Sequence, residues 1–245
     1  MRYSYSSVST FGNCPYRWKL TYLDKLKTIP DTAPDNALWL GLSIHKGIET
    51  GSVAEAIAEY KRHYNIITDA NINWMIQIEY QLPKVIDLLP KGGEHELEVK
   101  LPNFIGYVDY VCGDTLFDFK FSNNVDGYSK SPQLPIYKYY LEQVRPDLHI
   151  NHLKYVMIPK VGIRQKKTET IFEFRQRLQE HLNASEIKIV EVDYSPYSVT
   201  QFLECCQVLN TVTEFPKHES RLCSWCCYEP LCKRGENWII VDNDQ

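Results

Sequence analysis

The chain has 245 residues, of which 44% are hydrophobic, and its formal net charge is −4. This composition can bury a core, which excludes global disorder, and the mildly acidic balance excludes a protein coated in basic charge but not a local nucleic-acid groove. No run of about 18 apolar residues occurs, so we expect no membrane span. The N-terminus lacks the apolar stretch of a secretory signal, so we expect a cytoplasmic protein.

Helical and strand patterns alternate along the chain. A helix is predicted from Ser7 to about Tyr22, and a Pro/Asp-rich stretch, 28–36, ends it. The later predicted helices are 38–50, 53–66, 72–88, 131–144, 169–182 and 196–212. The predicted strands are 94–101, 104–112, 115–121, 151–158 and 186–193. Helices packed on a short mixed sheet indicate an α/β fold, followed by an irregular, cysteine-rich end at 216–245.

The block GYVDYVCGDTLFDFK, residues 106–120, carries the strongest chemical signal. Two strand-like runs flank Gly113-Asp114, a pair that suits a two-residue hairpin turn. In that register Asp109 lies directly opposite Asp118. Directly opposed side chains share one face of a sheet, with Cβ atoms roughly 5 Å apart.

Two carboxylates this close repel each other unless a cation lies between them, and a hard divalent ion such as Mg²⁺ suits that position. Lys120, two residues beyond Asp118, shares the face and can hold an attacking water or stabilise charge on a phosphate. A plainer interpretation is a solvated hairpin face with an Asp–Lys surface pair. A three-residue loop would place Asp109 opposite Phe117 instead.

Other polar residues have two interpretations each. His45 lies on an apolar-looking helix, where it is either a satisfied core residue or a metal ligand. Gln133 and Tyr137 are four residues apart and share a helix face, which ordinary amphipathic packing also explains.

The cysteines form a second constellation. Cys223-x-x-Cys226 followed by Cys232 places three thiols within one short segment of a chain that has no export signal. Thiolates at this spacing suit Zn²⁺ or an iron–sulfur cluster, and the remaining interpretation is a set of buried free thiols. Cys227 is an extra neighbour that competes with Cys226 as a ligand of this site. The cysteines expected in the ordinary core are Cys112, Cys205 and Cys206.

The order of these features resembles the PD-(D/E)XK nuclease superfamily, specifically its RecB-like branch. That branch includes the AddB nuclease domain, the CRISPR-adaptation iron–sulfur exonucleases and related phage exonucleases. The similar segments cover most of the chain and include a Cys-Pro helix, a Gly-x-x-x-His helix, an Asp motif, a (D/E)-x-K motif, a Gln-x-x-x-Tyr motif and a cysteine cluster. They are SVSTFGNCPYRWKLTYL (7–23), GLSIHKGIE (41–49), GYVDYV (106–111), DFK (118–120), QLPIY (133–137) and CSWCCYEPLC (223–232).

The resemblance implies a restriction-endonuclease-like core, a central mixed β-sheet flanked by helices, with helical insertions and a cysteine-rich C-terminal iron–sulfur region. All of 1–245 would form a single nuclease domain. Its core would span about 38–160, and the segments 1–27 and 216–245 would be joined by the cysteine cluster.

The resemblance also implies roles for single residues. The metal ligands would be His45, Asp109, Asp118 and the carbonyl oxygen of Phe119, holding Mg²⁺ or Mn²⁺. The catalytic set would be Asp109, Asp118, Lys120, Gln133 and Tyr137, with the last two orienting the lysine or the DNA backbone. A [4Fe–4S] cluster, or alternatively Zn²⁺, would be bound by Cys14, Cys223, Cys226 and Cys232. Relatives carry a glutamate near Glu98, which makes it a further candidate, although the alternation of Glu94, Glu96 and Glu98 favours the solvent face.

The function implied by the resemblance is a metal-dependent deoxyribonuclease. We expect an exonuclease that acts on single-stranded DNA or free ends in recombination, repair or replication, together with partner proteins of those processes. Basic residues within 160–167 are candidates for phosphate contacts. Two other interpretations stay open: a catalytically inactive nuclease-fold protein that binds DNA or acts as a scaffold, and a zinc-binding interaction module.

Overall fold

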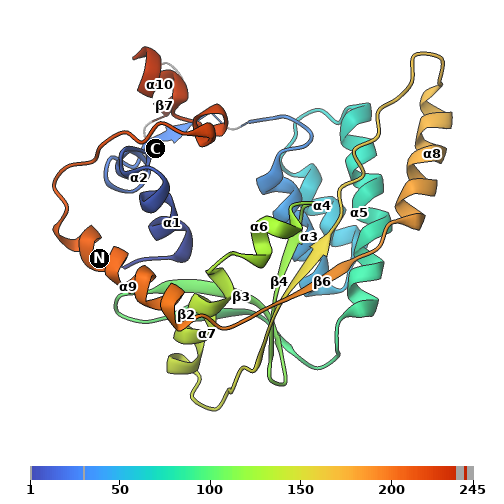
Figure 1. The fold of residues 1–245 in the computed structure, drawn as a ribbon. Helices are drawn as coiled ribbons and strands as arrows, with labels where there is room; N and C mark the ends of the chain where they lie inside the picture. Colours follow the sequence, from blue (N-terminus) through green and yellow to red (C-terminus); the bar gives the residue numbers. More distant parts are fainter. Residues whose placement is uncertain (1, 30, 236–239, 242–245) are drawn as a thin grey trace. The chain divides into compact units, whose positions relative to one another are not determined.

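The computed structural model describes residues 2–29, 31–235 and 240–241 (Figure 1). The chain divides into two compact units, each described here by itself. The terminal unit consists of Met1–Asp31, Lys100–Gly106 and Ser195–Gln245, and the sheet unit consists of Thr32–Val99 and Tyr107–Tyr194. The single nuclease domain expected for 1–245 stays a prediction, and 236–239 and 242–245 of the predicted cysteine-rich end lie outside the described residues.

A five-stranded sheet in the order β2-β3-β4-β5-β6 organises the sheet unit. The strands are β2 (Glu94–Lys100), β3 (Ile105–Cys112), β4 (Thr115–Phe121), β5 (His152–Ile158) and β6 (Lys188–Val192). β4 pairs with β5 in parallel, whereas β3 with β4 and β5 with β6 are antiparallel. The predicted α/β class with a mixed sheet is therefore confirmed, and the arrangement is consistent with a restriction-endonuclease-like fold.

The turn between β3 and β4 has the predicted two-residue form. The paired residues are Tyr110 with Phe117, Val111 with Leu116, and Cys112 with Thr115. Gly113 has a φ of 60°, a left-handed conformation that glycine adopts without the steric penalty of a side chain. This register places Asp109 and Asp118 on the same face of the sheet.

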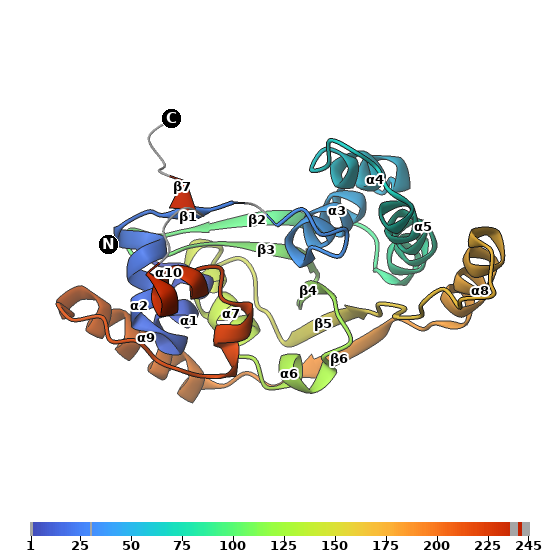
Figure 2. The same cartoon turned by 90° about the horizontal axis from the view of Figure 1, so that it is seen from above.

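Helices cover the sheet unit on both sides. They are α3 (Ala37–Thr50), α4 (Val53–Lys61), α5 (Asp69–Leu88), α6 (Val125–Ser129), α7 (Gln133–Val144) and α8 (Ile171–Ala184). Figure 2 shows α3, α4 and α5 on one side of β4 and β5, with α6 on the other. Among the described residues, no helix is both long and apolar enough to cross a membrane.

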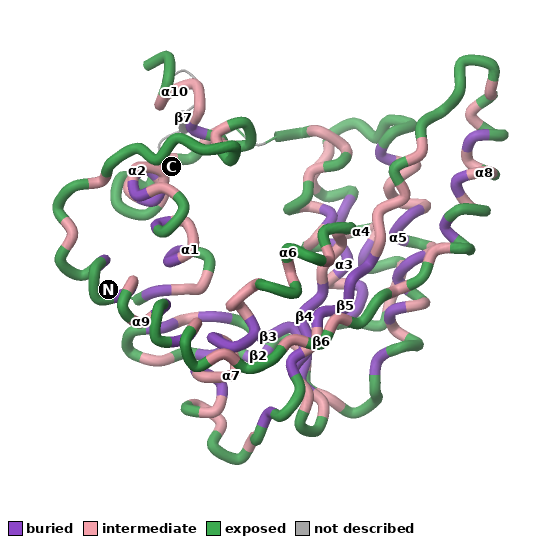
Figure 3. Tube along the Cα trace, in the orientation of Figure 1, coloured by how far each residue is buried: buried purple, intermediate pink, exposed green. Residues whose placement is uncertain are grey.

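The main core of the sheet unit lies between α3, α5 and the strands. Ile44 of α3 and Leu82 of α5 are fully buried in one cluster with Phe117 and Phe119 of β4. Figure 3 shows these buried segments in purple. Because alternate residues of a strand point to opposite faces, the same packing directs Asp118 to the other side of β4.

The terminal unit contains α1 (Tyr5–Asn13), α2 (Pro15–Trp18), a π-helix (Lys19–Leu23), α9 (Pro196–Thr211), a 3₁₀ helix (Arg221–Trp225) and α10 (Glu229–Arg234). β1 (Lys27–Thr28) pairs antiparallel with β7 (Ile240–Val241). The predicted continuous helix from Ser7 to about Tyr22 is wrong, because Cys14 is extended, with φ −160° and ψ 105°. Pro15 lacks an N–H and disfavours helical geometry in the preceding residue, which explains the break.

The N- and C-terminal segments pack together within this unit. Trp18 is buried, stacks on Phe215 with ring centroids 5.7 Å apart, and donates from Nε1 to the Ser7 hydroxyl at 3.0 Å. The Tyr228 hydroxyl donates to the Leu26 carbonyl at 2.6 Å. These contacts join segments far apart in sequence by ordinary packing, so the join does not depend on a metal alone.

Candidate active site

Three potential metal ligands meet in the sheet unit, contributed by α3, β2 and β3. One donor atom from each of His45, Glu96 and Asp109 lies within 4.8 Å of the other two. His45 Nδ1 is 3.5 Å from Asp109 Oδ1 and 3.7 Å from Glu96 Oε1. One imidazole and two carboxylates at this spacing are a donor set that fits a divalent cation such as Mn²⁺ or Mg²⁺.

The backbone of Phe119 lies against the same group. Its carbonyl oxygen is 3.2 Å from His45 Nε2, and its N–H donates to Asp109 Oδ2 at 2.8 Å. The structure thus brings together three of the four residues that the sequence resemblance implied as metal ligands.

Asp118, the fourth, is not part of the three-donor group. It is only 2% exposed, and its Oδ1 accepts a 3.0 Å hydrogen bond from Gln133 Nε2. Its Oδ2 forms an ion pair with Lys120 Nζ at 2.5 Å. Tyr137, one helical turn after Gln133, is close enough to Asp118 for the negative charge to act on its hydroxyl. Burial and Asp118 raise the pKa of Tyr137 to about 12.

Glu96 is the site residue that the sequence interpretation missed. Alternation placed Glu94, Glu96 and Glu98 on a solvent face, with Glu98 as the candidate. In the structure Glu96 has a φ of 49°, an uncommon conformation for a residue other than glycine in a strand. Glu98 instead accepts a 3.3 Å hydrogen bond from the Tyr107 hydroxyl. A local backbone irregularity of this kind leaves no signal in the residue pattern.

The buried charges of the site compete for protons. Burial and the neighbouring Asp118 raise the pKa of Asp109 to about 7. Burial lowers the pKa of His45, but Asp109, Glu96 and Asp118 outweigh it and raise that pKa to about 9. Without a cation the site therefore holds protons at neutral pH, and a divalent cation would displace them.

Lys120 lies between carboxylates and aromatic rings. Burial lowers its pKa, but Asp118 and Asp109 have the larger combined effect, so the pKa is raised and the side chain stays protonated. Its Nζ is 5.5 Å from the centroid of the Tyr128 ring and 5.9 Å from that of Tyr155. Such cation–π contacts hold the ammonium group in one position beside Asp118.

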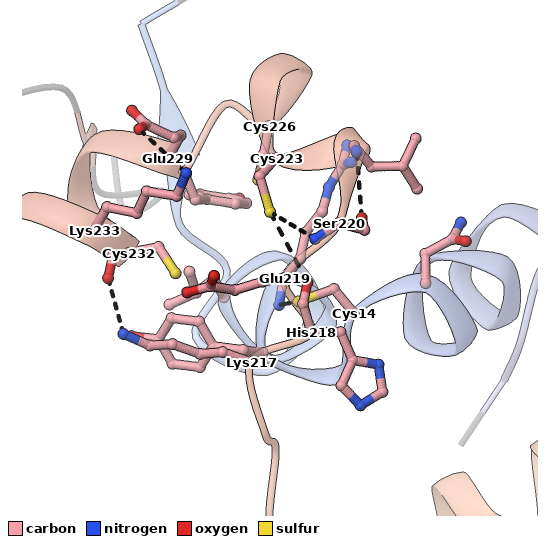
Figure 4. A pocket seen from close by; sticks show the side chains of 16 residues that line it. Cys14, Lys217, His218, Glu219, Ser220, Cys223, Cys226, Glu229, Cys232 and Lys233 are labelled. Carbon is pink, nitrogen blue, oxygen red and sulfur yellow. Dashed lines mark hydrogen bonds and ion pairs between the residues drawn. The ribbon is translucent and has the colours of Figure 1, made fainter.

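The cysteines predicted as cluster ligands line one cavity of about 430 Å³ in the terminal unit. They are Cys14, Cys223, Cys226 and Cys232, and Figure 4 shows them with the neighbouring polar side chains. Cys14 Sγ accepts from Arg17 N and Cys223 Sγ from Ser220 N, each at 3.5 Å. The extra neighbour, Cys227, is exposed and does not line the cavity.

The basic residues of segment 160–167 differ in burial. Lys160 Nζ lies over the rings of Phe121 and Trp74, at 5.2 and 5.7 Å from their centroids, and burial lowers its pKa. Lys166 and Lys167 are exposed. Lys160 is therefore part of the packing, and the other lysines of the segment are available to solvent.

Comparison with known proteins agrees with this arrangement. A family model for the PD-(D/E)XK nuclease superfamily matches residues 2–233, a span that includes the carboxylate site and the four cysteines. No curated protein matches the chain closely enough to count as a relative. Nucleases of this superfamily use divalent metals, which agrees with the donor set of His45, Glu96 and Asp109.

The geometry predicts that Glu96, rather than Glu98, contributes to metal binding. Glu96→Gln removes one anionic donor, so the affinity for Mn²⁺ should fall by about tenfold or more, as expected when a charged ligand is lost. Glu98→Gln is the matched control on the same strand and should bind Mn²⁺ like the parent. Isothermal titration of Mn²⁺ into each protein measures the difference. Equal affinities of the two variants for Mn²⁺ would show that Glu96 is not a metal ligand.

Proton competition predicts a pH dependence of metal binding. The protons on Asp109 and His45 leave as the pH rises through about 7 and about 9, so the affinity for Mn²⁺ should increase across that window. Titrations in two buffers of different ionisation enthalpy count the protons released on binding. An affinity for Mn²⁺ that is independent of pH between about 6 and about 10, a range that brackets both pKa values, contradicts the prediction.

Proposed function

Because the chain belongs to the PD-(D/E)XK nuclease superfamily, we propose that it is a Mg²⁺- or Mn²⁺-dependent deoxyribonuclease that hydrolyses phosphodiester bonds from DNA ends. The observation that carries this proposal is the convergence of His45, Glu96 and Asp109 near the buried Asp118–Lys120 pair. An inactive relative would have no need to keep so costly a set of buried charges.

The residues of this site divide the chemistry between them. The cation would be held by His45, Asp109, Asp118 and the Phe119 carbonyl, together with Glu96, whose carboxylate lies close to His45 and Asp109. When bound, the cation lowers the pKa of a water molecule and offsets charge on the phosphate. Asp109 is fixed for this role by the Phe119 N–H, which keeps one carboxylate oxygen oriented.

Lys120 would act on the nucleophile and the phosphate. Its ammonium group is held by Asp118 and by two aromatic rings, so it can donate a hydrogen bond to an attacking water or to a phosphate oxygen without first reorganising. Gln133 would keep Asp118 in place through its 3.0 Å hydrogen bond. Tyr137, with its pKa raised to about 12, stays protonated and would act as a donor toward the lysine side of the site or the DNA backbone.

For the cysteine pocket we propose a structural [4Fe–4S] cluster bound by Cys14, Cys223, Cys226 and Cys232. Backbone N–H groups directed at the sulfurs of Cys14 and Cys223 support thiolate ligands, since such hydrogen bonds stabilise cluster sulfurs. Four thiolates around one cavity suit a [4Fe–4S] cluster or, alternatively, Zn²⁺.

The alternative functions make different demands. A catalytically inactive DNA-binding scaffold requires no cation at Asp109, and a zinc-binding interaction module requires four thiolates at zinc spacing. A role in recombination, repair or replication, with protein partners from those processes, follows from the family resemblance and is part of the proposal.

Substitutions at the carboxylate site test the enzyme. Asp118→Ala and Lys120→Ala should each lower the rate of DNA cleavage in Mn²⁺ by at least about a hundredfold, because each removes a charge that stabilises the transition state. Asp114→Ala, an exposed aspartate at the hairpin turn, is the matched control and should cleave like the parent. Cleavage is followed on labelled linear DNA, with EDTA as the metal-free reference, and retained cleavage in either site variant refutes the assignment.

End dependence is tested with the parent protein. An exonuclease degrades linear DNA progressively and leaves a covalently closed circle of the same sequence intact. Nicking of the closed circle at a comparable rate would identify an endonuclease instead, while leaving the metal-dependent chemistry unchanged.

The cluster proposal predicts a contrast between two cysteine substitutions. Cys14→Ala should abolish iron binding and lower the free energy of unfolding by several kcal/mol, because a cluster that joins residues far apart in sequence restricts the unfolded chain. Cys227→Ser changes an exposed neighbour and should leave both unchanged. Iron and sulfide are quantified in protein purified without oxygen. A colourless parent that contains zinc would replace the cluster with the zinc alternative.

A further inference from the structure

One face of α3 exposes apolar side chains next to the candidate metal ligand. Leu38 is 59% exposed and Leu42 is 44% exposed. With 100° of rotation per residue, Leu38, Gly41, Leu42 and His45 fall on one face of the helix. The opposite face, which includes Leu40 and Ile44, is fully buried in the core. The exposed leucines therefore do not belong to the core. They form a separate surface on the same helix face as His45.

Gly41 supplies an independent reason to expect a ligand on this surface. Glycine inside a helix is unfavourable relative to alanine, so its presence needs a physical cause. For Gly47, on the buried face of α3, the cause is packing, since an added Cβ would lie 2.3 Å from a methyl carbon of Leu82. For Gly41 an added Cβ would meet nothing within 4 Å. A bare helix backbone between two exposed leucines leaves room for a molecule that is not part of the chain.

We propose that Leu38, Gly41 and Leu42, here called the α3 apolar face, contact the base and sugar of the nucleotide beside the scissile phosphate. The inference rests on the proposed function. Leu38 and His45 are seven residues apart, and this length of helix spans about 10 Å. A phosphate at the metal ligands leaves its attached nucleoside within reach of this surface. Leucine side chains complement the apolar faces of a base, and the absent side chain of Gly41 lets the sugar approach the helix.

The α3 apolar face is suited to contact with a base rather than with a phosphate, because it carries no charged or hydrogen-bonding side chain. Leu38, Gly41 and Leu42 offer no hydrogen-bonding side chain, so the surface cannot distinguish one base from another by donors and acceptors. We therefore expect a contact that is independent of sequence and, unlike phosphate binding, insensitive to salt. This contact would give a higher affinity for single-stranded than for double-stranded DNA, because unpaired bases are free to unstack.

The test combines removal of leucine with removal of the base. DNA binding is measured by fluorescence anisotropy in an Asp118→Asn background with Mn²⁺, on a single-stranded oligonucleotide and on an abasic strand that keeps every sugar and phosphate. Leu42→Ser should weaken binding of the normal strand at least fivefold, about 1 kcal/mol, and leave binding of the abasic strand unchanged. The loss of affinity caused by Leu42→Ser and the loss caused by removing the bases should not be additive, because both changes remove the same contact.

Leu88→Ser is the matched control. Leu88 is a 43% exposed leucine on α5, against 44% for Leu42, and lies outside the site. Its substitution should change neither binding constant. Equal effects of Leu42→Ser and Leu88→Ser, or an equal loss by Leu42→Ser on both strands, would overturn the inference.

Gly41→Leu separates contact from folding. Leucine is a better helix former than glycine, and a Cβ at this position meets nothing within 4 Å, so the melting temperature should rise while affinity for the normal strand falls at least about fivefold. Gly47→Ala should lower the melting temperature, because its Cβ collides with Leu82. A Gly41→Leu protein that binds the normal strand like the parent overturns the inference. If the parent protein cleaves DNA in that case, the proposed function still stands, whereas a parent that never cleaves rejects both.

Discussion

The burial of two carboxylates on adjacent strands is the constraint on which the rest of the sheet unit depends. Asp109 and Asp118 are 9% and 2% exposed, and ionised groups at such depth are unfavourable without compensation. The surrounding structure supplies that compensation: the Phe119 N–H to Asp109, and Gln133 and Lys120 to Asp118. His45 adds a positive charge that a divalent cation can replace. The same contacts that make burial tolerable also orient the groups for metal binding.

Packing on the other side of β4 makes this arrangement possible. Phe117 and Phe119 pack against α3 and α5, and the alternation of the strand then sends Asp118 to the opposite face. His45 reaches the Phe119 carbonyl because the buried face of α3, through Ile44 and its neighbours, fixes the helix on the sheet. The apolar core and the charged site are therefore two sides of one hairpin, and a substitution that shifts the hairpin would affect both.

The two candidate sites differ in how the chain builds them. The carboxylate site lies on long elements, namely α3, the strands β2 to β4 and the start of α7, and Glu96 is its one residue with left-handed backbone among the described residues. The cysteine pocket uses short segments, a break at Cys14, a 3₁₀ helix and the six-residue α10. Small, irregular elements bury little apolar surface, and a bound cluster would supply the stabilisation that packing of this kind lacks. Trp18, Phe215 and Tyr228 provide the remaining contacts in that unit.

The residue pattern alone determined the local features that depend on neighbours in sequence. The Gly113-Asp114 turn and its register followed from turn chemistry, the five strands from their composition, and the grouping of His45 with Asp109 from the family resemblance. Only the tertiary structure decided what depends on backbone exceptions and on distant contacts. It brought Glu96 to the site through a left-handed residue inside a strand. The break of the first helix at Cys14, by contrast, follows from Pro15, a local signal that the helix prediction did not use. Periodicity describes regular backbone, and one irregular residue redirects a side chain without altering the pattern.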